Sequence, residues 1–213
     1  MLTRDLLRQD GFPPWRDFDL ADDVLQPSEP GRNLPGDRLF FAVQPPPATV
    51  PIISRLAWHQ RDKHRLTGKP LRPRCFHISL LFAGYHGQLP PETLDALVAA
   101  AGRVAMRRFR VSLDWMGSFR QPPKRPLVLR GDDGVAGLIW LRDRLVAATM
   151  DVPGSPPAAR NSFTPHLTLL YDEAEIREEP VEEIGWPVTE FVLIRSVFGQ
   201  SRHIVLQRWP LRG

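Results

Sequence analysis

Two short segments of this chain have nearly the same sequence and carry side chains that can transfer protons. Residues 76–82 read FHISLLF and residues 165–171 read PHLTLLY. Each has a histidine, an aliphatic residue, a hydroxyl residue, two leucines and an aromatic residue in the same order. Chance is a poor explanation for a repeat that falls on chemically active residues. We therefore take His77, Ser79, His166 and Thr168 as the candidate catalytic residues.

Histidine and hydroxyl side chains together supply the groups that phosphodiester cleavage needs. One group must take a proton from the attacking oxygen, and another must give a proton to the leaving oxygen. An imidazole has a reference pKa of about 6.5 and can fill either role, while hydroxyls can hold the non-bridging phosphate oxygens. Ser and Thr are poor metal ligands, and neither motif carries a carboxylate or a further histidine. The pattern predicts acid–base cleavage with no metal and no cofactor.

Each motif is expected to lie on a β-strand that places the histidine and the hydroxyl on one face. Successive side chains of a strand point to opposite faces, so His77 and Ser79 share a face and the residues between them pack into a core. By the same alternation, Phe82 and Tyr171 fall on the core face. Two such strands side by side would form a polar cleft.

The rest of the chain must supply the elements that bring the two motifs together. Strands are predicted at 38–43, 75–83, 109–115, 126–130, 165–171, 190–197 and 203–209, and helices at 49–66, 90–105 and 134–150. They mix without a steady βαβ rhythm, which favours an α+β fold with antiparallel sheet. Residues 1–36 are rich in Pro, Gly and Asp and are interpreted as an N-terminal arm, with residues 37–213 as a single domain.

The composition is that of an ordinary globular protein. The chain has 213 residues, of which 42% are hydrophobic, enough to bury a core. No apolar run approaches the roughly 20 residues of a membrane span, and the N-terminus lacks a signal-peptide pattern. We expect a cytoplasmic monomer without membrane contact. Cys75 is the only cysteine and is expected to be a buried spectator, and 28 Lys and Arg against 24 Asp and Glu mildly favour a polyanionic partner.

Beyond these patterns, the sequence resembles the two-histidine (2H) phosphoesterases, in particular the branch called 2′-5′ RNA ligase or RNA 2′,3′-cyclic phosphodiesterase. The resemblance runs from about residue 38 to 211. It is carried by the HISL and HLTL motifs and supported by the phrases RLFFAV, FHISLLFAG, FTPHLTLLYD and EFVLIRSVFG…VLQRWPL.

This resemblance implies a bilobal fold in which two similar α+β halves with antiparallel sheets face each other across a central cleft, each lending one motif strand. It also implies opening of a 2′,3′-cyclic phosphate of RNA or a nucleotide to a 2′-phosphate, or reversible joining of RNA ends through a 2′-5′ linkage. Carried over residue by residue, the catalytic set is His77, Ser79, His166 and Thr168. We assign His166 as the base that activates water and His77 as the acid, although the roles could be exchanged.

The chain departs from the family pattern after the second motif. Many members of the branch carry an arginine there, where this chain has Tyr171 and Asp172. Another cation must then meet the phosphate charge. The candidates from neighbouring loops are Arg130, Arg160, Arg120 and Lys124.

Aromatic side chains near the motifs could stack on a base. The candidates are Phe40, Phe82, Trp115, Phe119 and Tyr171, of which Phe82 and Tyr171 are expected to pack in the core first. Four other histidines match no pattern and are interpreted as surface or structural residues: His59, His64, His86 and His203.

Two other functions remain open at this level. A nucleotide- or RNA-binding module could keep the cleft with little catalysis, a reading that the absent arginine favours. A phosphodiesterase for another small cyclic nucleotide would keep the chemistry and change the substrate.

Overall fold

The computed structural model describes residues 36–85, 90–120, 123–154 and 163–212. Its strands are β1 Arg38–Val43, β2 Ile78–Tyr85, β3 Phe109–Ser118, β4 Arg125–Arg130, β5 Leu167–Asp172, β6 Glu179–Val188, β7 Glu190–Val197 and β8 Arg202–Pro210. Its helices are α1 Val50–Lys63, α2 Pro91–Gly102 and α3 Ala136–Thr149, with short 3-10 turns η1 Pro73–Cys75 and η2 Asp133–Val135. The predicted α+β class is confirmed. The predicted N-terminal arm lies outside the described residues, apart from residue 36.

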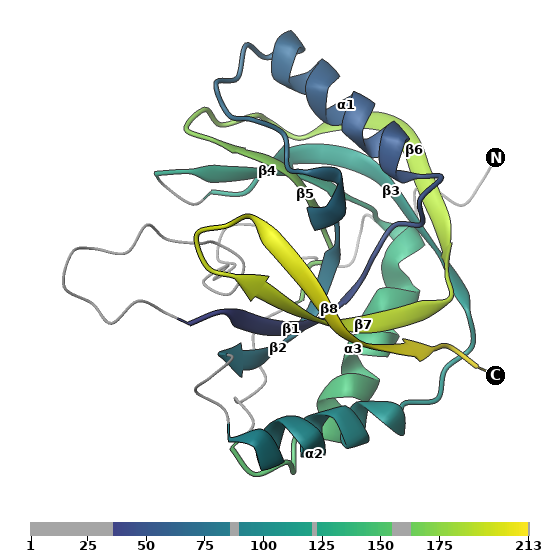
Figure 1. Cartoon of the computed structure of the whole chain (residues 1–213). Helices are drawn as coiled ribbons and strands as arrows, with labels where there is room; N and C mark the ends of the chain where they lie inside the picture. The colour runs from purple at the N-terminus through teal and green to yellow at the C-terminus, as the bar shows by residue number, and fades with distance from the viewer. Residues whose placement is uncertain (1–35, 86–89, 121–122, 155–162, 213) are drawn as a thin grey trace, which may run out of the picture.

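The strands form two four-stranded antiparallel sheets with the same plan (Figure 1). The first sheet has the order β2-β1-β7-β8, and the second has the order β5-β4-β3-β6. In each sheet the motif strand, β2 or β5, lies at one edge beside β1 or β4. The fold is therefore two lobes of matching topology, each contributing one motif strand, as the sequence predicted; the cleft between them stays a prediction.

The helices are divided between the two sheets. Helix α1 packs against β5 of the second sheet, while α3 contacts β2 and α2 contacts β8 of the first. In Figure 1, α1 lies above the upper sheet, α2 lies at the bottom of the view, and α3 runs vertically behind the lower sheet. Helix α1 leaves β1 of the first sheet and covers the second, so the chain crosses between the lobes before the first motif.

One hydrophobic core joins both sheets. It contains Phe41 and Leu80 of the first sheet together with Leu113 and Leu169 of the second, all buried. A smaller apolar cluster covers the other face of the first sheet and is built from Phe40, Ala42, Val192 and Ile194. The alternation of Phe40 and Phe41 in β1 therefore separates a core face from a second face, on which the first motif's histidine lies.

Strand β6 is the one described strand that the sequence patterns did not predict. Its sequence, EPVEEIGWPV, contains two prolines and three glutamates, and only three of its residues are buried. Prolines are tolerated because β6 is an edge strand of its sheet, where one side of the ladder needs no donor. Its buried Trp186 anchors it in the core.

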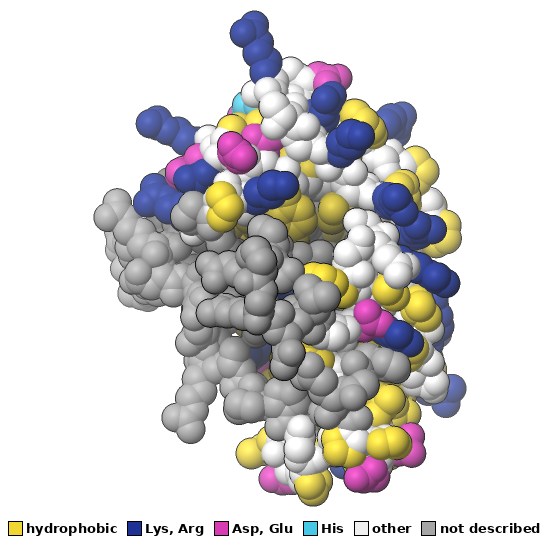
Figure 2. Space-filling view, turned by 60° about the vertical axis from the view of Figure 1, so that its left-hand side comes forward, with side chains coloured by type: hydrophobic (Ala, Val, Ile, Leu, Met, Phe, Trp, Pro, Cys, Tyr) yellow, Lys and Arg dark blue, Asp and Glu magenta, His cyan; other side chains and the backbone are white. Residues whose placement is uncertain are grey.

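The surface of the described residues carries mixed charge. On the face drawn in Figure 2, Lys and Arg side chains stand out along the upper and right-hand edges, with acidic side chains among them. No helix in the described ranges is long and apolar enough to cross a membrane.

Candidate active site

Both motif histidines lie at the entrance of their strands, immediately before the first paired residue. The predicted strands 75–83 and 165–171 begin later than expected, at Ile78 and Leu167. Before the first motif, η1 turns the chain and ends at Cys75. As a result His77 and His166 belong to extended connections that run straight into β2 and β5.

The same hydrogen bond fixes each imidazole. His77 Nδ1 lies 2.8 Å from the carbonyl oxygen of Cys75, and His166 Nδ1 lies 2.9 Å from the carbonyl oxygen of Thr164. In both cases the acceptor belongs to the residue two positions earlier. A carbonyl oxygen can only accept, so Nδ1 must carry the proton and Nε2 is the nitrogen that exchanges protons. Two separate segments thus present their imidazoles in one tautomer.

The structure shows different surroundings for the two motif hydroxyls, Ser79 and Thr168. Ser79 Oγ lies 3.1 Å from His77 Nε2, so in the neutral imidazole the hydroxyl donates to that nitrogen. Thr168 is 9% exposed and lies opposite Val128 in the β4–β5 pair. The prediction that His77 and Ser79 share one face is confirmed by this contact.

The two histidines differ in burial. His77 is half-buried, whereas His166 is 8% exposed. Neither is a member of the hydrophobic core that joins the sheets. Phe119, which follows β3, lies edge-on to the His166 ring, with the ring centres 4.9 Å apart.

The prediction that Phe82 and Tyr171 face the core is wrong, because each motif strand contains a β-bulge. In the β1–β2 pair the register skips Leu80, and in the β4–β5 pair it skips Leu169, which occupies the same place in the second motif. A bulge reverses the alternation beyond it. Consequently Phe82 lies opposite Phe40, on the face away from the core.

Tyr171 is displaced in the same way. It pairs with Pro126, which lies two residues from Val128, the partner of Thr168. Tyr171 therefore lies on the face of Thr168, and its side chain is half-buried. The two bulges give the motif strands a shared local shape in which the aromatic residue follows the histidine and hydroxyl to the same side.

The chain before the first motif is attached to the strand of the second. Leu71 N donates to the Leu169 carbonyl oxygen at 2.8 Å, and Pro70 forms a bridge with Leu170. Gly68 lies so close to this strand that a Cβ would be 2.0 Å from the Tyr171 carbonyl oxygen. Strands β2 and β5 also contact each other directly. The structure thus brings the two motif segments side by side although 89 residues separate the histidines.

Asp172, at the end of β5, stabilises the contact between this strand and the segment before the first motif. Its Oδ2 accepts from Gly68 N at 2.6 Å and from Thr67 Oγ1 at 3.2 Å, and its Oδ1 accepts from Ala174 N at 2.9 Å. Burial by itself would raise the pKa of Asp172, but these hydrogen bonds outweigh it and hold the pKa below its usual range. Asp172 is therefore a charged structural residue at the position where an arginine was expected.

Arg130 is the predicted cation that the structure places beside a motif. It ends β4, is 6% exposed and forms an ion pair with Glu178. Its guanidinium lies 6.0 Å from the centre of the Phe119 ring, which contacts His166. Burial lowers the pKa of Arg130 to about 10, so it remains charged at neutral pH.

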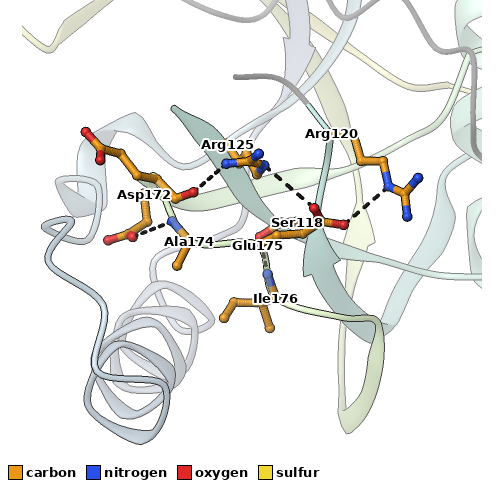
Figure 3. A network of polar contacts seen from close by, with 8 residues as sticks. Ser118, Arg120, Arg125, Asp172, Ala174, Glu175 and Ile176 are labelled. Carbon is orange, nitrogen blue, oxygen red and sulfur yellow. Dashed lines mark hydrogen bonds and ion pairs between the residues drawn. The ribbon is translucent and has the colours of Figure 1, made fainter. Parts of the chain in front are cut away.

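The other predicted cations are not placed in this way. Arg120 Nε donates to Glu175 at 3.2 Å, and the same carboxylate lies 3.9 Å from Arg125 Nε (Figure 3). Figure 3 shows both arginines directed at Glu175, beside the connection between β3 and β4. Lys124 is exposed in that hairpin, and Arg160 lies outside the described residues.

A third histidine packs against the first motif. The His203 ring stands edge-on to the His77 ring at 4.9 Å, and Phe40 lies against both rings at 4.9 Å and 5.7 Å. Phe40 was predicted near the site, but His203 was interpreted as a surface or structural residue. It comes from β8, more than a hundred residues away, and no local motif marks it.

Cys75 is buried, as predicted, and its thiol donates to the Ser201 carbonyl oxygen at 3.3 Å. Burial raises the pKa of this thiol, which disfavours the reactive thiolate. In the part of the chain that the structure describes, no three His, Cys, Asp or Glu side chains form a group that could hold a metal ion.

Comparisons with known proteins agree with this geometry. The model of the 2′-5′ RNA ligase superfamily matches residues 45–198. The RNA 2′,3′-cyclic phosphodiesterase of Escherichia coli (strain K12) is 30% identical over 189 residues, which are 82% of this chain and 96% of that protein. The phosphodiesterase of the same description from Aeropyrum pernix is 31% identical over 126 residues, 55% of this chain and 66% of that protein.

A solved structure gives the same result in three dimensions. The crystal structure of E. coli LigT complexed with 3′-AMP superimposes with a TM-score of 0.68 at 30% identity and covers 83% of this chain and 99% of that one. The family match, the shared length and the paired histidine motifs lead to one conclusion: this chain belongs to the 2′-5′ RNA ligase superfamily.

Proposed function

We propose that the protein is a phosphodiesterase that opens 2′,3′-cyclic phosphates at RNA ends or on nucleotides to 2′-phosphates, with His77 and His166 as its acid and base. The E. coli and Aeropyrum relatives carry the description RNA 2′,3′-cyclic phosphodiesterase. One chain supplies both motifs, so a monomer suffices for the reaction.

The observation that carries the catalytic assignment is the matched pair of Nδ1 hydrogen bonds. Each carbonyl acceptor holds its imidazole in one orientation and leaves Nε2 as the exchanging nitrogen. Such a partner fixes both tautomer and ring angle, which a proton donor or acceptor needs before the substrate arrives. Solvated surface histidines would not share this arrangement across two distant segments.

The proposed reaction balances with water as the only co-reactant. His166 Nε2 takes a proton from water as the water oxygen forms a bond to phosphorus. The bond from phosphorus to the ribose O3′ breaks, and His77 Nε2 gives its proton to that oxygen. The product is a 2′-phosphate with a free 3′-hydroxyl. Both imidazoles then return to their starting states by exchange with solvent.

Burial supports this distribution of roles. A charged imidazole is disfavoured where water is excluded, so the nearly buried His166 suits the base, which must start neutral. The half-buried His77 suits the acid, which must start protonated. If the 5′-hydroxyl of a second RNA strand replaced water as the nucleophile, the same proton transfers would break the bond from phosphorus to O3′ and join the RNA ends through a 2′-5′ linkage.

Groups beside the histidines would hold the phosphate oxygens. The Ser79 and Thr168 hydroxyls can donate to the non-bridging oxygens. Arg130 is the cation nearest the second motif and would take the place of the arginine expected after it. Phe40 and Tyr171 lie on the motif faces of their sheets and could stack on a base.

The test is turnover of a nucleoside 2′,3′-cyclic phosphate and of a cyclic-ended RNA, with the product isomer identified by chromatography. The wild type is expected to form the 2′-phosphate alone. Because a positioned acid or base contributes about 10²- to 10⁴-fold, His77→Ala and His166→Ala should each lower kcat by that factor. His59→Ala, which removes an exposed histidine of α1, is the matched control and should leave kcat unchanged.

Two outcomes would contradict the proposal, and one would restrict its substrate to nucleotides. A nucleotide that stays intact while bound would indicate a binding module instead. Turnover of small cyclic nucleotides with no turnover of cyclic-ended RNA would exclude RNA as the substrate. An equal, small effect of His59→Ala and His166→Ala would remove the second motif from catalysis.

A further inference from the structure

A depression at the start of β3, the end of the strand away from Phe119 and His166, combines apolar and cationic side chains. It lies where the C-terminal segment meets the connection between α2 and β3, at the lower right of Figure 1, and it has a volume of about 730 Å³. Its apolar lining comes from Met106, Phe109 and Trp140. Its cations are Arg107, Arg108, Arg144 and Arg212. We call this the arginine pocket.

The pocket is built from well-packed elements. Met106 forms a bridge with Arg212, which joins the two connecting segments. The Phe109 ring lies against the first turn of α3, where a Cβ on Gly137 would be 2.2 Å from the ring, so only glycine permits this approach. Trp140 and Arg144 are four residues apart on α3 and therefore lie on the same face of the helix. The lining is thus held in place by the core.

The charge in the pocket is not neutralised within the described residues. All four arginines are exposed, and none forms an ion pair with any carboxylate in the described ranges. The neighbouring Arg110 differs, because it pairs with Glu183 at 3.6 Å. The pocket therefore gathers positive charge that lacks a protein counter-charge.

An exposed tryptophan stands among these charges. Trp140 is 59% exposed, so its ring is accessible to a planar partner. Cationic side chains that track a phosphate backbone, interleaved with an aromatic ring on which bases stack, are what single-stranded nucleic acid requires. An acidic peptide could form ion pairs with the arginines, but its carboxylates would not stack on the Trp140 ring.

We propose that the arginine pocket binds single-stranded RNA, as a second contact for the strand whose cyclic end enters the motif site. The choice of RNA rests on the proposed function. Strand β3 connects the two places, since Phe109 lines the pocket and Phe119, just beyond the strand, contacts His166. Its ten residues at about 3.3 Å each make the separation roughly 30 Å.

This separation sets a length for the substrate. A stacked strand advances about 3.4 Å per nucleotide, so about nine nucleotides are needed to reach from the motif site to the pocket. Shorter substrates can occupy only the motif site. Longer ones gain the second contact, and KM should fall once the strand exceeds this length.

The first experiment measures binding of a fluorescent single-stranded oligouridylate without a cyclic end, by anisotropy at several salt concentrations. Trp140→Ala is expected to raise Kd by about 5- to 150-fold, the effect of one lost base–aromatic stack. Arg107→Gln with Arg144→Gln should lower the slope of log K against log salt by roughly 1.4, because a single strand releases about 0.7 counterion per phosphate contact.

The matched control is Arg55→Gln with Arg110→Gln, which removes the same charge from exposed positions outside the pocket and should leave the salt slope near the wild-type value. All these side chains are exposed, and thermal unfolding will confirm that the variants fold. Equal effects of the pocket and control variants on Kd would overturn the proposal. Anionic vesicles or polyaspartate that bind as tightly as RNA, with no loss on Trp140→Ala, would also overturn it.

The second experiment separates this inference from the proposed function. Turnover of a mononucleotide 2′,3′-cyclic phosphate by the pocket variants should equal that of the wild type, while KM for long cyclic-ended RNA should rise. If neither the wild type nor any variant turns over the mononucleotide or the cyclic-ended RNA, the proposed function fails. If KM shows no dependence on strand length, the pocket is not a substrate contact and this inference is wrong.

Discussion

The first motif, which enters β2, and the second, which enters β5, hold their imidazoles by the same hydrogen bond but surround them differently. His77 has two other rings against it, Phe40 and His203, and its own Ser79 at Nε2. Phe119 lies edge-on to the His166 ring, and the guanidinium of Arg130 lies 6.0 Å from the centre of the Phe119 ring. The topology thus repeats the placement of the imidazole, while the flanking strands decide which groups surround it.

The largest expected effect tests whether the two imidazoles have different roles. Turnover by the wild type should be bell-shaped in pH, because the base must be neutral and the acid protonated. In the residual activity of His166→Ala the fall at low pH should disappear, and in that of His77→Ala the fall at high pH should disappear. Rates at pH 5 to 9 measure both. Loss of the same limb in both variants would mean that the lobes are functionally equivalent.

The next expected effect concerns Arg130, the charged residue beside the second motif but not the first. Arg130→Gln should raise KM for the cyclic nucleotide by about 10- to 150-fold, since a hydrogen bond to a charged group contributes roughly 1.5–3 kcal/mol. Arg120→Gln is the matched control, because that arginine is exposed and pairs with Glu175.

A second variant separates phosphate binding from folding. Glu178→Gln removes the carboxylate that forms an ion pair with Arg130, so that the guanidinium no longer shares its charge with Glu178. If Arg130 binds substrate, this variant should keep or lower KM. A matching rise in KM for Glu178→Gln and Arg130→Gln would instead show that the ion pair matters only for structure.

The attachment of the segment before the first motif to β5 depends on Asp172, whose Oδ2 accepts from Gly68 N. Asp172→Asn should lower the free energy of unfolding by about 1–3 kcal/mol, because charge-assisted hydrogen bonds to Gly68 and Ala174 are lost. The folded state holds the pKa of this carboxyl below its usual 3.8, so its stabilisation is present above that pH and is lost as pH falls through the folded pKa.

Chemical denaturation at pH 6 and at pH 3 measures this contribution. The difference between the wild type and Asp172→Asn should be larger at pH 6 and shrink at pH 3, because pH 3 lies below the usual pKa of 3.8 and the unfolded chain then binds the proton. If the difference in unfolding free energy stayed constant with pH, the packing of Asp172, and not its charge, would stabilise its contact with Gly68.

The smallest expected effect concerns the rings around His77. A ring pair contributes about 0.5–1.5 kcal/mol beyond its buried area, so His203→Ala should lower kcat by about 2- to 10-fold. His203→Phe keeps the ring and should restore most of that loss if His203 only positions His77. Should the phenylalanine variant be as slow as the alanine variant, the imidazole of His203 has a chemical role of its own.

Several strands could be predicted from the sequence because a local pattern of residues specifies them. The strand at 38–43 and the strand at 190–197 have the predicted bounds, since their apolar runs are closed by turn residues or prolines. The two motifs were found for a similar reason, as each is a contiguous segment. Strand β6 was missed because its prolines and glutamates contradict the usual strand pattern, and only its place at a sheet edge makes them acceptable.

The bulges limited what alternation could predict. The alternation rule assigns Phe82 and Tyr171 to the core, but the rule holds only while the strands stay in register. Leu80 and Leu169 break the register in the same place, and both aromatic residues change face. A bulge depends on how the neighbouring strand packs, and nothing in the motif itself signals it.

The sequence by itself determined which side chains are the catalytic candidates, because histidine and hydroxyl identities and their spacing along a strand are local properties. Tertiary structure alone decided which groups surround them. Arg130 lies beside the second motif while Arg120 is held by Glu175, and His203 reaches His77 from β8. The pairing of β3 with β4 and of β7 with β8 brings these neighbours to the motifs. Such contacts join residues at no regular sequence separation, so the sequence alone does not reveal them.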